Sequence, residues 1–231
     1  MELSRRSLFT CAAAVAAVGL TAPRVSAEPF GTLLDYAGGV PSVDAIMQAG
    51  HLGAIRYVSD RRPGAEWMAG KPLLAGEAEA LRAAGLQVVS CYQFGKGPTA
   101  DWRGGFEAGQ RHAERGLELH LAAGGPPDRP IYTSIDDNPS AEEFDAMIRP
   151  YLEGWESVAG HQNTGVYGNA PTIDWSIAAG LGSYYWQHNW GTPQGYVHPA
   201  AHLHQFEIDK RVVDGIGVDL NHILAESYGQ W

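Results

Sequence analysis

The feature that most constrains the fold is the alternation of strand-like and helix-like stretches along the 231 residues of the chain. Eight strand-like stretches occur, and a helix-like stretch follows each of the first five. This order predicts a (β/α)8 TIM-like barrel of parallel strands, and an open doubly wound sheet is the alternative. The strand-like stretches are residues 32–35, 53–58, 86–94, 131–136, 165–167, 183–188, 202–206 and 217–220; the helix-like stretches are residues 42–48, 76–84, 105–123, 141–158 and 173–179.

The C-terminal units of this barrel leave little room for helices. We expect residues 189–201 and 208–215 to be loops between the last three strands. A barrel of this kind usually needs about 250 residues and has a floor near 200. The sequence therefore predicts a minimal barrel that is irregular on its C-terminal side, formed by residues 28–231 as one domain.

The stretch around Asp136 has the pattern of a buried strand that ends in acids. Residues with odd numbers from Ile131 to Ile135 alternate with Tyr132, Ser134 and Asp136, which is the period of a strand. The first set can face a layer of helices, and the second set would then point into the barrel. A carboxylate at the end of a barrel strand lies where such enzymes keep their chemistry.

Acidic residues stand at four strand ends: Asp35, Asp136 with Asp137, Glu207 and Asp219. In a closed barrel these ends meet at one face, so we expect Asp35, Asp136, Glu207 and Asp219 to surround one cleft. Crowded carboxylates raise one another's pKa, and burial raises it further. One acid can then stay protonated while another is ionised, as cleavage of a glycosidic bond requires. In the alternative interpretation, Asp136 and Asp137 only shape the turn or cap the next helix.

Aromatic side chains on or just after the strands give flat surfaces on which sugar rings can stack. Any one of them can equally belong to the core. The predicted substrate-binding residues are the aromatic Tyr36, Tyr92, Tyr167 and Trp186, together with the polar Asp137, Gln205 and Asn221.

The order of several short motifs resembles that of the family-25 lysozymes, which are muramidases built on an irregular barrel. It resembles even more closely the glycoside-hydrolase-like domain of actinobacterial proteins exported by the twin-arginine pathway. The resemblance spans residues 28–231, and Asp219-Leu220-Asn221 is the best single match. The motifs are Leu33-Leu34-Asp35, Ile135-Asp136, Gly165-Val166-Tyr167, Trp186-Gln187, His204-Gln205-Phe206 and Val218-Asp219-Leu220-Asn221.

This resemblance implies roles for individual acids. Asp35 matches the Asp of the lysozymes' first strand, and Asp219 matches the Asp of their last strand. Asp136 matches the catalytic Glu of their Asp-x-Glu motif, whose first Asp is Ser134 here. The shorter arm of Asp136 moves the carboxyl group by about one bond, and catalysis is sensitive to misplacement of about 1 Å. We therefore expect Asp136 to carry the acid/base work, and Asp35 and Asp219 to position the sugar or stabilise the oxocarbenium-like state. Glu207 has no counterpart in the motif and is the second catalytic candidate.

The N-terminal segment has the three parts of an export signal in their usual order. Arg5-Arg6 lies in a Ser-Arg-Arg-Ser-Leu-Phe sequence that resembles the twin-arginine signature. An apolar stretch from Cys11 to Ala22 follows and is short for a membrane span, and Val25-Ser26-Ala27 supplies small residues for cleavage. We therefore expect residues 1–27 to be a signal peptide read by the twin-arginine translocase, and no stable membrane span to remain after cleavage.

Composition excludes several other classes of function. The formal net charge of −10 argues against nucleic acid as a partner. No Walker or dinucleotide glycine motif follows a strand, and we expect no cofactor. We also expect no metal, because alternation places His202 and His204 on the face opposite Glu207. Cys91 lies in an apolar strand and is predicted to be a packed thiol.

Together these features favour an exported, glycoside-hydrolase-like protein that acts on a cell-envelope glycan, such as peptidoglycan, through its strand-end carboxylates. The protein would then act in the periplasm, in the cell wall or outside the cell. The alternative is a non-catalytic glycan-binding or cell-envelope structural protein on a lysozyme-like barrel that has lost the Asp-x-Glu pair. A barrel fold alone does not decide between them.

Overall fold

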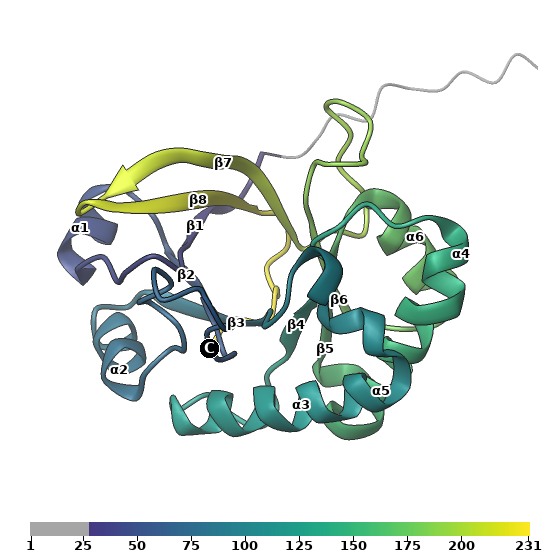
Figure 1. The fold of residues 1–231 in the computed structure, drawn as a ribbon. Helices are drawn as coiled ribbons and strands as arrows, with labels where there is room; N and C mark the ends of the chain where they lie inside the picture. The colour runs from purple at the N-terminus through teal and green to yellow at the C-terminus, as the bar shows by residue number, and fades with distance from the viewer. Residues whose placement is uncertain (1–27) are drawn as a thin grey trace, which may run out of the picture.

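The computed structural model describes residues 28–231, which form a closed barrel with its strands in the order β1 to β8. The barrel confirms the predicted fold class, whereas the expected signal peptide, residues 1–27, lies outside the described residues. Figure 1 shows the helices α3, α5 and α6 on one side of the barrel and the β7–β8 hairpin on another. The elements are β1 (Gly31–Asp35), α1 (Val43–Gln48), β2 (Gly53–Tyr57), α2 (Ala75–Ala83), β3 (Gln87–Tyr92), α3 (Gly105–Ala122), β4 (Ile131–Ser134), α4 (Ala141–Glu143), α5 (Arg149–Ala159), β5 (Thr164–Gly168), α6 (Ala170–Ala178), β6 (Tyr184–Gln187), β7 (Leu203–Val213) and β8 (Ile216–Ile223).

The last strand departs from the predicted parallel arrangement. Strands β1 to β7 pair in parallel with their neighbours along the chain, whereas β8 runs antiparallel to both β7 and β1. The expectation of a loop over residues 208–215 was wrong, because most of it belongs to a long β-hairpin. Asp214 and Gly215 form its turn with φ of 52° and 75°. Positive φ at both central residues is the geometry of a tight hairpin turn, for which Asp-Gly is a favoured pair.

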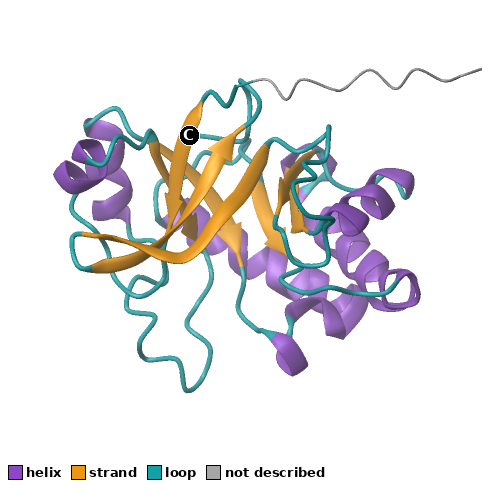
Figure 2. Cartoon of the chain, turned by 90° about the horizontal axis from the view of Figure 1, so that it is seen from above, coloured by secondary structure: helices purple, strands orange, loops and turns teal. Residues whose placement is uncertain are grey.

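The alternation predicted for the stretch around β4 is confirmed. Ile131 and Ile135 pack into a cluster with residues of α3 and α5. Tyr132 lies on the other face, in the cluster that fills the barrel with Leu33 and Ile55. Seen from above, the strands occupy the centre and helices flank them on both sides (Figure 2). Strands β2 to β5 are buried on both faces almost throughout, as βα-units require.

The interior of the barrel divides into an apolar part and a polar part. Leu33, Val89 and Ile223 lie deep in the barrel and are almost completely buried. Nearer the C-terminal ends of β1 and β4 the inward positions change to Asp35 and Asp136. The apolar part packs the fold, and the polar part is open for a site. Among residues 28–231, no helix is both long and apolar enough to cross a membrane.

Candidate active site

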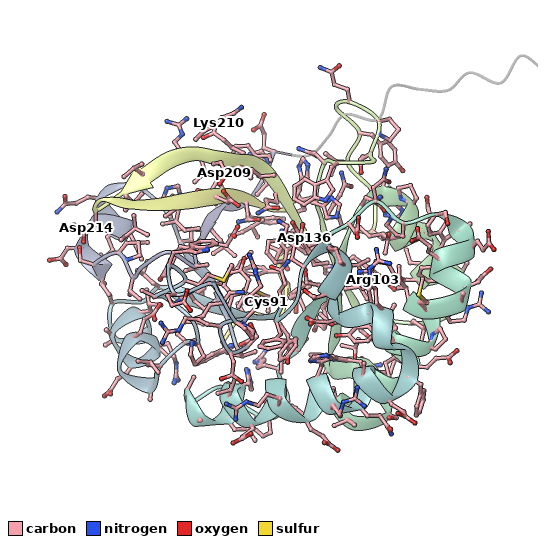
Figure 3. All side chains as sticks on the ribbon, viewed as in Figure 1. Cys91, Arg103, Asp136, Asp209, Lys210 and Asp214 are labelled. Carbon is pink, nitrogen blue, oxygen red and sulfur yellow. The ribbon has the colours of Figure 1, made fainter. Side chains whose placement is uncertain are left out.

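A cavity of about 440 Å³ lies at the end of the barrel where the parallel strands have their C-termini. Three of the four acids that the sequence predicts for one cleft line it: Asp35 from β1, Asp136 just after β4, and Asp219 from β8. Figure 3 shows Asp136 near the centre of the molecule and Asp209 on the hairpin. Because β8 is antiparallel, Asp219 stands directly opposite Asp35 in the strand register.

Asp35 and Asp219 share one hydrogen-bond donor. Gln205 Nε2 donates to Asp35 Oδ2 at 3.2 Å and to Asp219 Oδ2 at 3.0 Å. Asn221 Nδ2 donates to the same oxygen of Asp35 at 2.7 Å. A single amide nitrogen therefore bridges the two carboxyl groups in the cavity wall.

Aromatic side chains hold these two amides in place. Tyr167 donates its hydroxyl to Gln205 Oε1 at 2.6 Å, and Trp186 donates its indole N–H to Asn221 Oδ1 at 2.8 Å. Each amide oxygen is therefore occupied, which leaves each NH2 group to face the acids. Buried networks of this kind keep their geometry because every member is satisfied.

Burial is the main cause of the shifted pKa values of this pair. It raises the pKa of Asp35 to about 7, and the charge of Asp219 adds to the effect, while the hydrogen bonds from Asn221 and Gln205 oppose it. Burial also raises the pKa of Asp219 to about 6, against the hydrogen bond from the backbone of Asp209. Near neutral pH the pair can therefore retain a proton, as a general acid must.

An irregular stretch in β7 fixes the second oxygen of Asp219. The register between β7 and β8 shifts twice, between Gln205 and Glu207 and between Glu207 and Arg211. Asp209 lies in this stretch with a φ of 55° and donates its backbone N–H to Asp219 Oδ1 at 2.8 Å. Bulges commonly re-aim groups beside active sites, and this one aims an N–H at a carboxylate.

Asp136 has a different environment from the pair. Its Oδ2 accepts a hydrogen bond from Gln93 Nε2 and forms an ion pair with Lys96 Nζ, both at 2.8 Å. Its side chain is 12% exposed, whereas that of Lys96 is 58% exposed. Ser134 also lines the cavity, and its buried hydroxyl has no hydrogen-bond partner. Asp136 is therefore an acceptor held by two donors at the open part of the site.

Aromatic rings form part of the cavity lining. Tyr57, Tyr167, Trp186 and Trp190 line it from the barrel strands and the segment after β6. Trp67 lies on the loop between β2 and α2 and is 60% exposed, although it also borders the cavity. Exposed aromatic faces beside a polar cleft are suited to sugar rings.

Glu207 does not take the position expected for it. The bulge sets Glu207 opposite Leu220, which faces the outer apolar cluster, so its side chain lies on the outside of the barrel. There it forms an ion pair with Arg211 and does not border the cavity. Strict alternation after Gln205 predicted an inward side chain, and the extra residue of the bulge reverses this.

The remaining predicted binding residues divide between the cavity and its supports. Tyr167, Trp186, Gln205 and Tyr36 line the cavity, and the Tyr36 hydroxyl donates to Glu77. Asn221 acts through Asp35, as described above. Tyr92 bonds His112 within the helix-covered core, and Asp137 lies 3.5 Å from Arg103, so both are outside the cavity. Their roles in binding stay predictions.

Several cavity residues were missed in the sequence. Gln93 and Lys96 lie just after β3, and their position at a strand end was a usable signal for site residues. The Gly95-Lys96-Gly97-Pro98 sequence, however, has the pattern of a plain turn. Lys71 and Arg62 come from the loop between β2 and α2 and have no local pattern that marks them.

Cys91, predicted to be a packed thiol, is buried beside the cavity, and burial raises the pKa of its thiol.

The histidines on and around β7 make separate contacts. His198 bonds Asp174, and His204 bonds Asn189. Within residues 28–231, no group of three or more His, Cys, Asp or Glu side chains is placed to hold a metal ion.

Comparison with known proteins gives one family match. The family described as "Rv2525c-like, glycoside hydrolase-like domain" matches residues 44–223. The Mycobacterium tuberculosis protein named "Putative peptidoglycan hydrolase Rv2525c" is 60% identical, over 100% of both chains. A crystal structure of the M. tuberculosis Tat-secreted protein Rv2525c in complex with L-tartrate is 65% identical, covers 87% of this chain and 98% of that one, and has a TM-score of 0.86.

More distant structures share the fold. The bacterial lysozyme from Streptomyces coelicolor is 14% identical with a TM-score of 0.57, over 85% of this chain and 93% of that one. The modular autolysin LytC from Streptococcus pneumoniae, in complex with a synthetic peptidoglycan ligand, is 15% identical with a TM-score of 0.56, over 83% and 46% of the two chains. At this level of identity the likeness concerns the barrel alone.

Proposed function

This chain belongs to the Rv2525c-like, glycoside hydrolase-like domain family, and from that membership we propose that it is an exported hydrolase of cell-envelope glycan, with peptidoglycan as its substrate. One observation carries the proposal. Asp35, Asp136 and Asp219 come from three different strands and line one cavity with aromatic walls. Fold alone does not imply chemistry, but carboxylates in contrasting environments are what glycosidic cleavage requires.

The environments of the acids suggest a division of roles. Asp219 is more exposed to the cavity than Asp35, which is buried. We therefore assign to Asp219 the transfer of the pair's shared proton to the leaving oxygen. Asp136 meets only donors, Gln93 and Lys96, so we assign it the role of base or nucleophile at the anomeric carbon. This division differs from the expectation from the sequence, in which Asp136 carried the acid/base work and Asp219 positioned the sugar.

Export completes the proposal. The mycobacterial relative is described as Tat-secreted, and the Arg5-Arg6 pair of this chain lies in a matching context. We assign residues 1–27 to the signal peptide and residues 28–231 to the domain that acts in the envelope. Replacing both arginines with lysine should trap the precursor in the cytoplasm, as seen by fractionation and immunoblotting. Normal secretion of that variant would refute the twin-arginine route.

The test of the hydrolase is release of new reducing ends from purified envelope glycan between pH 4 and 8. The wild type should release them below about pH 6 to 7, where the pair retains its proton, and less at higher pH. Asp136→Asn and Asp219→Asn should each lower the rate by about 10²–10⁴-fold. Asp128→Asn is the matched control, because Asp128 is exposed on the loop before β4 and does not line the cavity, and its rate should equal that of the wild type.

A second candidate is glycan binding without turnover. It is favoured by Ser134, which stands where the lysozymes carry the first acid of their motif, and by the two donors already bound to Asp136. Calorimetric titration with peptidoglycan fragments separates the candidates. Measurable binding by the wild type with no reducing ends released, and equal binding by Asp136→Asn, would establish the second candidate.

A further inference from the structure

The long connection between β2 and α2, residues 58–74, forms one wall of the cavity. It contains no helix or strand, yet hydrogen bonds from a buried arginine and to the backbone after β1 hold it in place. Arg56 is completely buried and donates to the backbone oxygens of Tyr36 and Gly70. Gly70 N–H in turn donates to Ala37 O at 2.9 Å. Long loops without secondary structure are often functional, and this one is held rigidly beside β1.

Lys71 is the unusual residue of this loop. It is 3% exposed, its ammonium group donates to the backbone oxygen of Gln93 at 2.9 Å, and it lies 3.8 Å from the centre of the Tyr57 ring. Among residues 28–231, no carboxylate lies within 4 Å of its Nζ. An ammonium group has three donors, and buried charges are normally paired. Lys71 lines the cavity, and only one of the three N–H donors of its ammonium group is used, in the hydrogen bond to Gln93 O.

Arg62 lies on the same loop and also lines the cavity. Its one hydrogen-bond partner within the described chain is the sulfur of Met68, at 3.9 Å. Arg62 and Lys71 therefore reach the cavity from the same connection between β2 and α2. Neither has a carboxylate of residues 28–231 within 4 Å, so both cations are available to an anionic group of a ligand.

We propose that Arg62 and Lys71 form a subsite that binds a carboxylate substituent of the glycan, such as the lactyl group of N-acetylmuramic acid. The inference rests on the proposed function, because it places the sugar chain in the same cavity. A carboxylate suits the site better than a phosphate group, since Asp35, Asp136 and Asp219 share the cavity and would repel a second negative charge.

The test compares two forms of one ligand. The probes are a peptide-free tetrasaccharide of alternating N-acetylglucosamine and N-acetylmuramic acid, and its methyl ester, titrated by calorimetry into Asp136→Asn to prevent turnover. The free acid should bind at least about tenfold more tightly than the ester, because a hydrogen bond to a charged group contributes about that much. Lys71→Met and Arg62→Gln should each reduce this ratio, and the double variant should abolish it.

The controls carry the same substitutions outside the cavity. Arg61→Gln changes the exposed neighbour of Arg62, and Lys210→Met changes an exposed lysine that points away from the barrel in Figure 3. Both should keep the ratio. Circular dichroism shows whether each variant is folded, and Lys71→Arg, which keeps the charge, should retain the preference if Lys71→Met does not fold.

Dependence on pH identifies the lysine. Burial lowers the pKa of Lys71 to about 8; the charges of Arg62 and Arg56 add to the effect, and the charge of Asp101 opposes it. The preference for the free acid should therefore be largest below pH 8 and should decline above it, and in Arg62→Gln the decline should remain.

Equal affinity for acid and ester, a ratio that survives in the double variant, or no binding of either probe would overturn the subsite. Hydrolysis by the wild type is scored separately. Cleavage of envelope glycan without a preference for the acid refutes the subsite and leaves the hydrolase. A carboxylate preference without cleavage refutes the hydrolase and leaves the subsite.

Discussion

The helix-covered strands and the β7–β8 hairpin stabilise one site by different means. On the helix side, Trp155 and Tyr151 are completely buried between α3, α5 and the sheet. The outer half of the hairpin, which extends away from α5 and α6 in Figure 1, is exposed, and Val212 has 69% of its surface open to solvent. The helix side thus has the packing of a domain core, whereas the outer hairpin combines backbone pairing between β7 and β8 with only partly buried apolar contacts of Val213 and Ile216.

This difference extends to the acids. Asp136 follows a strand that is buried on both faces, and side chains of the β3 end hold it. Asp219 lies on the hairpin, where an amide side chain and a backbone N–H hold it. Both acids are therefore held by polar contacts, but the partners of Asp136 stand at the end of a strand packed on both faces, whereas those of Asp219 stand on the hairpin strand β7.

The largest expected effect concerns packing. Trp155→Ala should lower the free energy of unfolding by about 3–5 kcal/mol, because it empties a large volume in the core. Val212→Ala on the hairpin should change it by less than about 0.5 kcal/mol. Chemical denaturation monitored by circular dichroism measures both. Similar losses in the two variants would show that the hairpin is packed as tightly as the helix side.

The next effect concerns the cost of burying acids beside the hairpin. The folded protein raises the pKa of Asp35 to about 7 and that of Asp219 to about 6, above the ordinary value near 3.9. The folded state therefore binds protons more tightly than the unfolded state. The stability from this binding is complete below about pH 4 and is lost as the pH rises to about 7.

Asp35→Asn tests this linkage. Between pH 5 and 8 the wild type should lose about 2–4 kcal/mol, and the variant should lose much less. Glu79→Gln, on the exposed face of α2, should retain the dependence of the wild type. The measurement is the denaturation midpoint at each pH. A wild type that is more stable at pH 8 than at pH 5 would contradict the prediction.

A smaller effect separates the two sets of hydrogen bonds. Gln205→Met removes a donor that lowers the pKa of Asp35, so that pKa should rise and the alkaline limb of the pH–rate profile should move to higher pH. The value of kcat/KM should fall by roughly tenfold, the usual cost of a hydrogen bond to a charged group. Gln93→Met, on the Asp136 side, should leave that limb in place. An equal shift of the alkaline limb in both variants would mean that Asp136 and the Asp35–Asp219 pair titrate as one coupled group.

The smallest effect comes from the bulge. Asp209→Asn keeps the backbone N–H and a residue that tolerates positive φ, but it removes a charge that raises the pKa of Asp219. The pKa of Asp219 should fall, and stability should change by less than about 0.5 kcal/mol. Carbon-13 NMR of the aspartate carboxyl groups follows the titration, and an unchanged pKa of Asp219 would show that the exposed charge is screened.

The sequence was sufficient to predict the parallel part of the fold. Alternation placed Ile131 and Ile135 toward the helices and Tyr132 inside, as found. A buried strand repeats every two residues, and each βα-unit carries its own turn signals, so local patterns predict it. The meeting of Asp35, Asp136 and Asp219 at one face followed from closure of the barrel.

Other features depend on contacts that local patterns do not encode. Strand direction is not written into a strand's own residues, although Asp214-Gly215 was a hairpin signal that could have been used. The bulge inserts a residue without a distinctive motif and so turned Glu207 outward. Lys71 reaches the cavity because Arg56 anchors its loop, which is a tertiary contact.

The pairing of the first strand with the last has a consequence for when the site can exist. Asn221 and Asp35 are hydrogen-bonded although they are 186 positions apart. During synthesis the first strand emerges early and must wait for its final neighbour, and contacts of such high sequence separation form late in folding. A nascent or truncated chain therefore has no Asp35–Asp219 pair. A protein proposed to attack the cell's own wall would thus remain inert on the ribosome until its last strand is made.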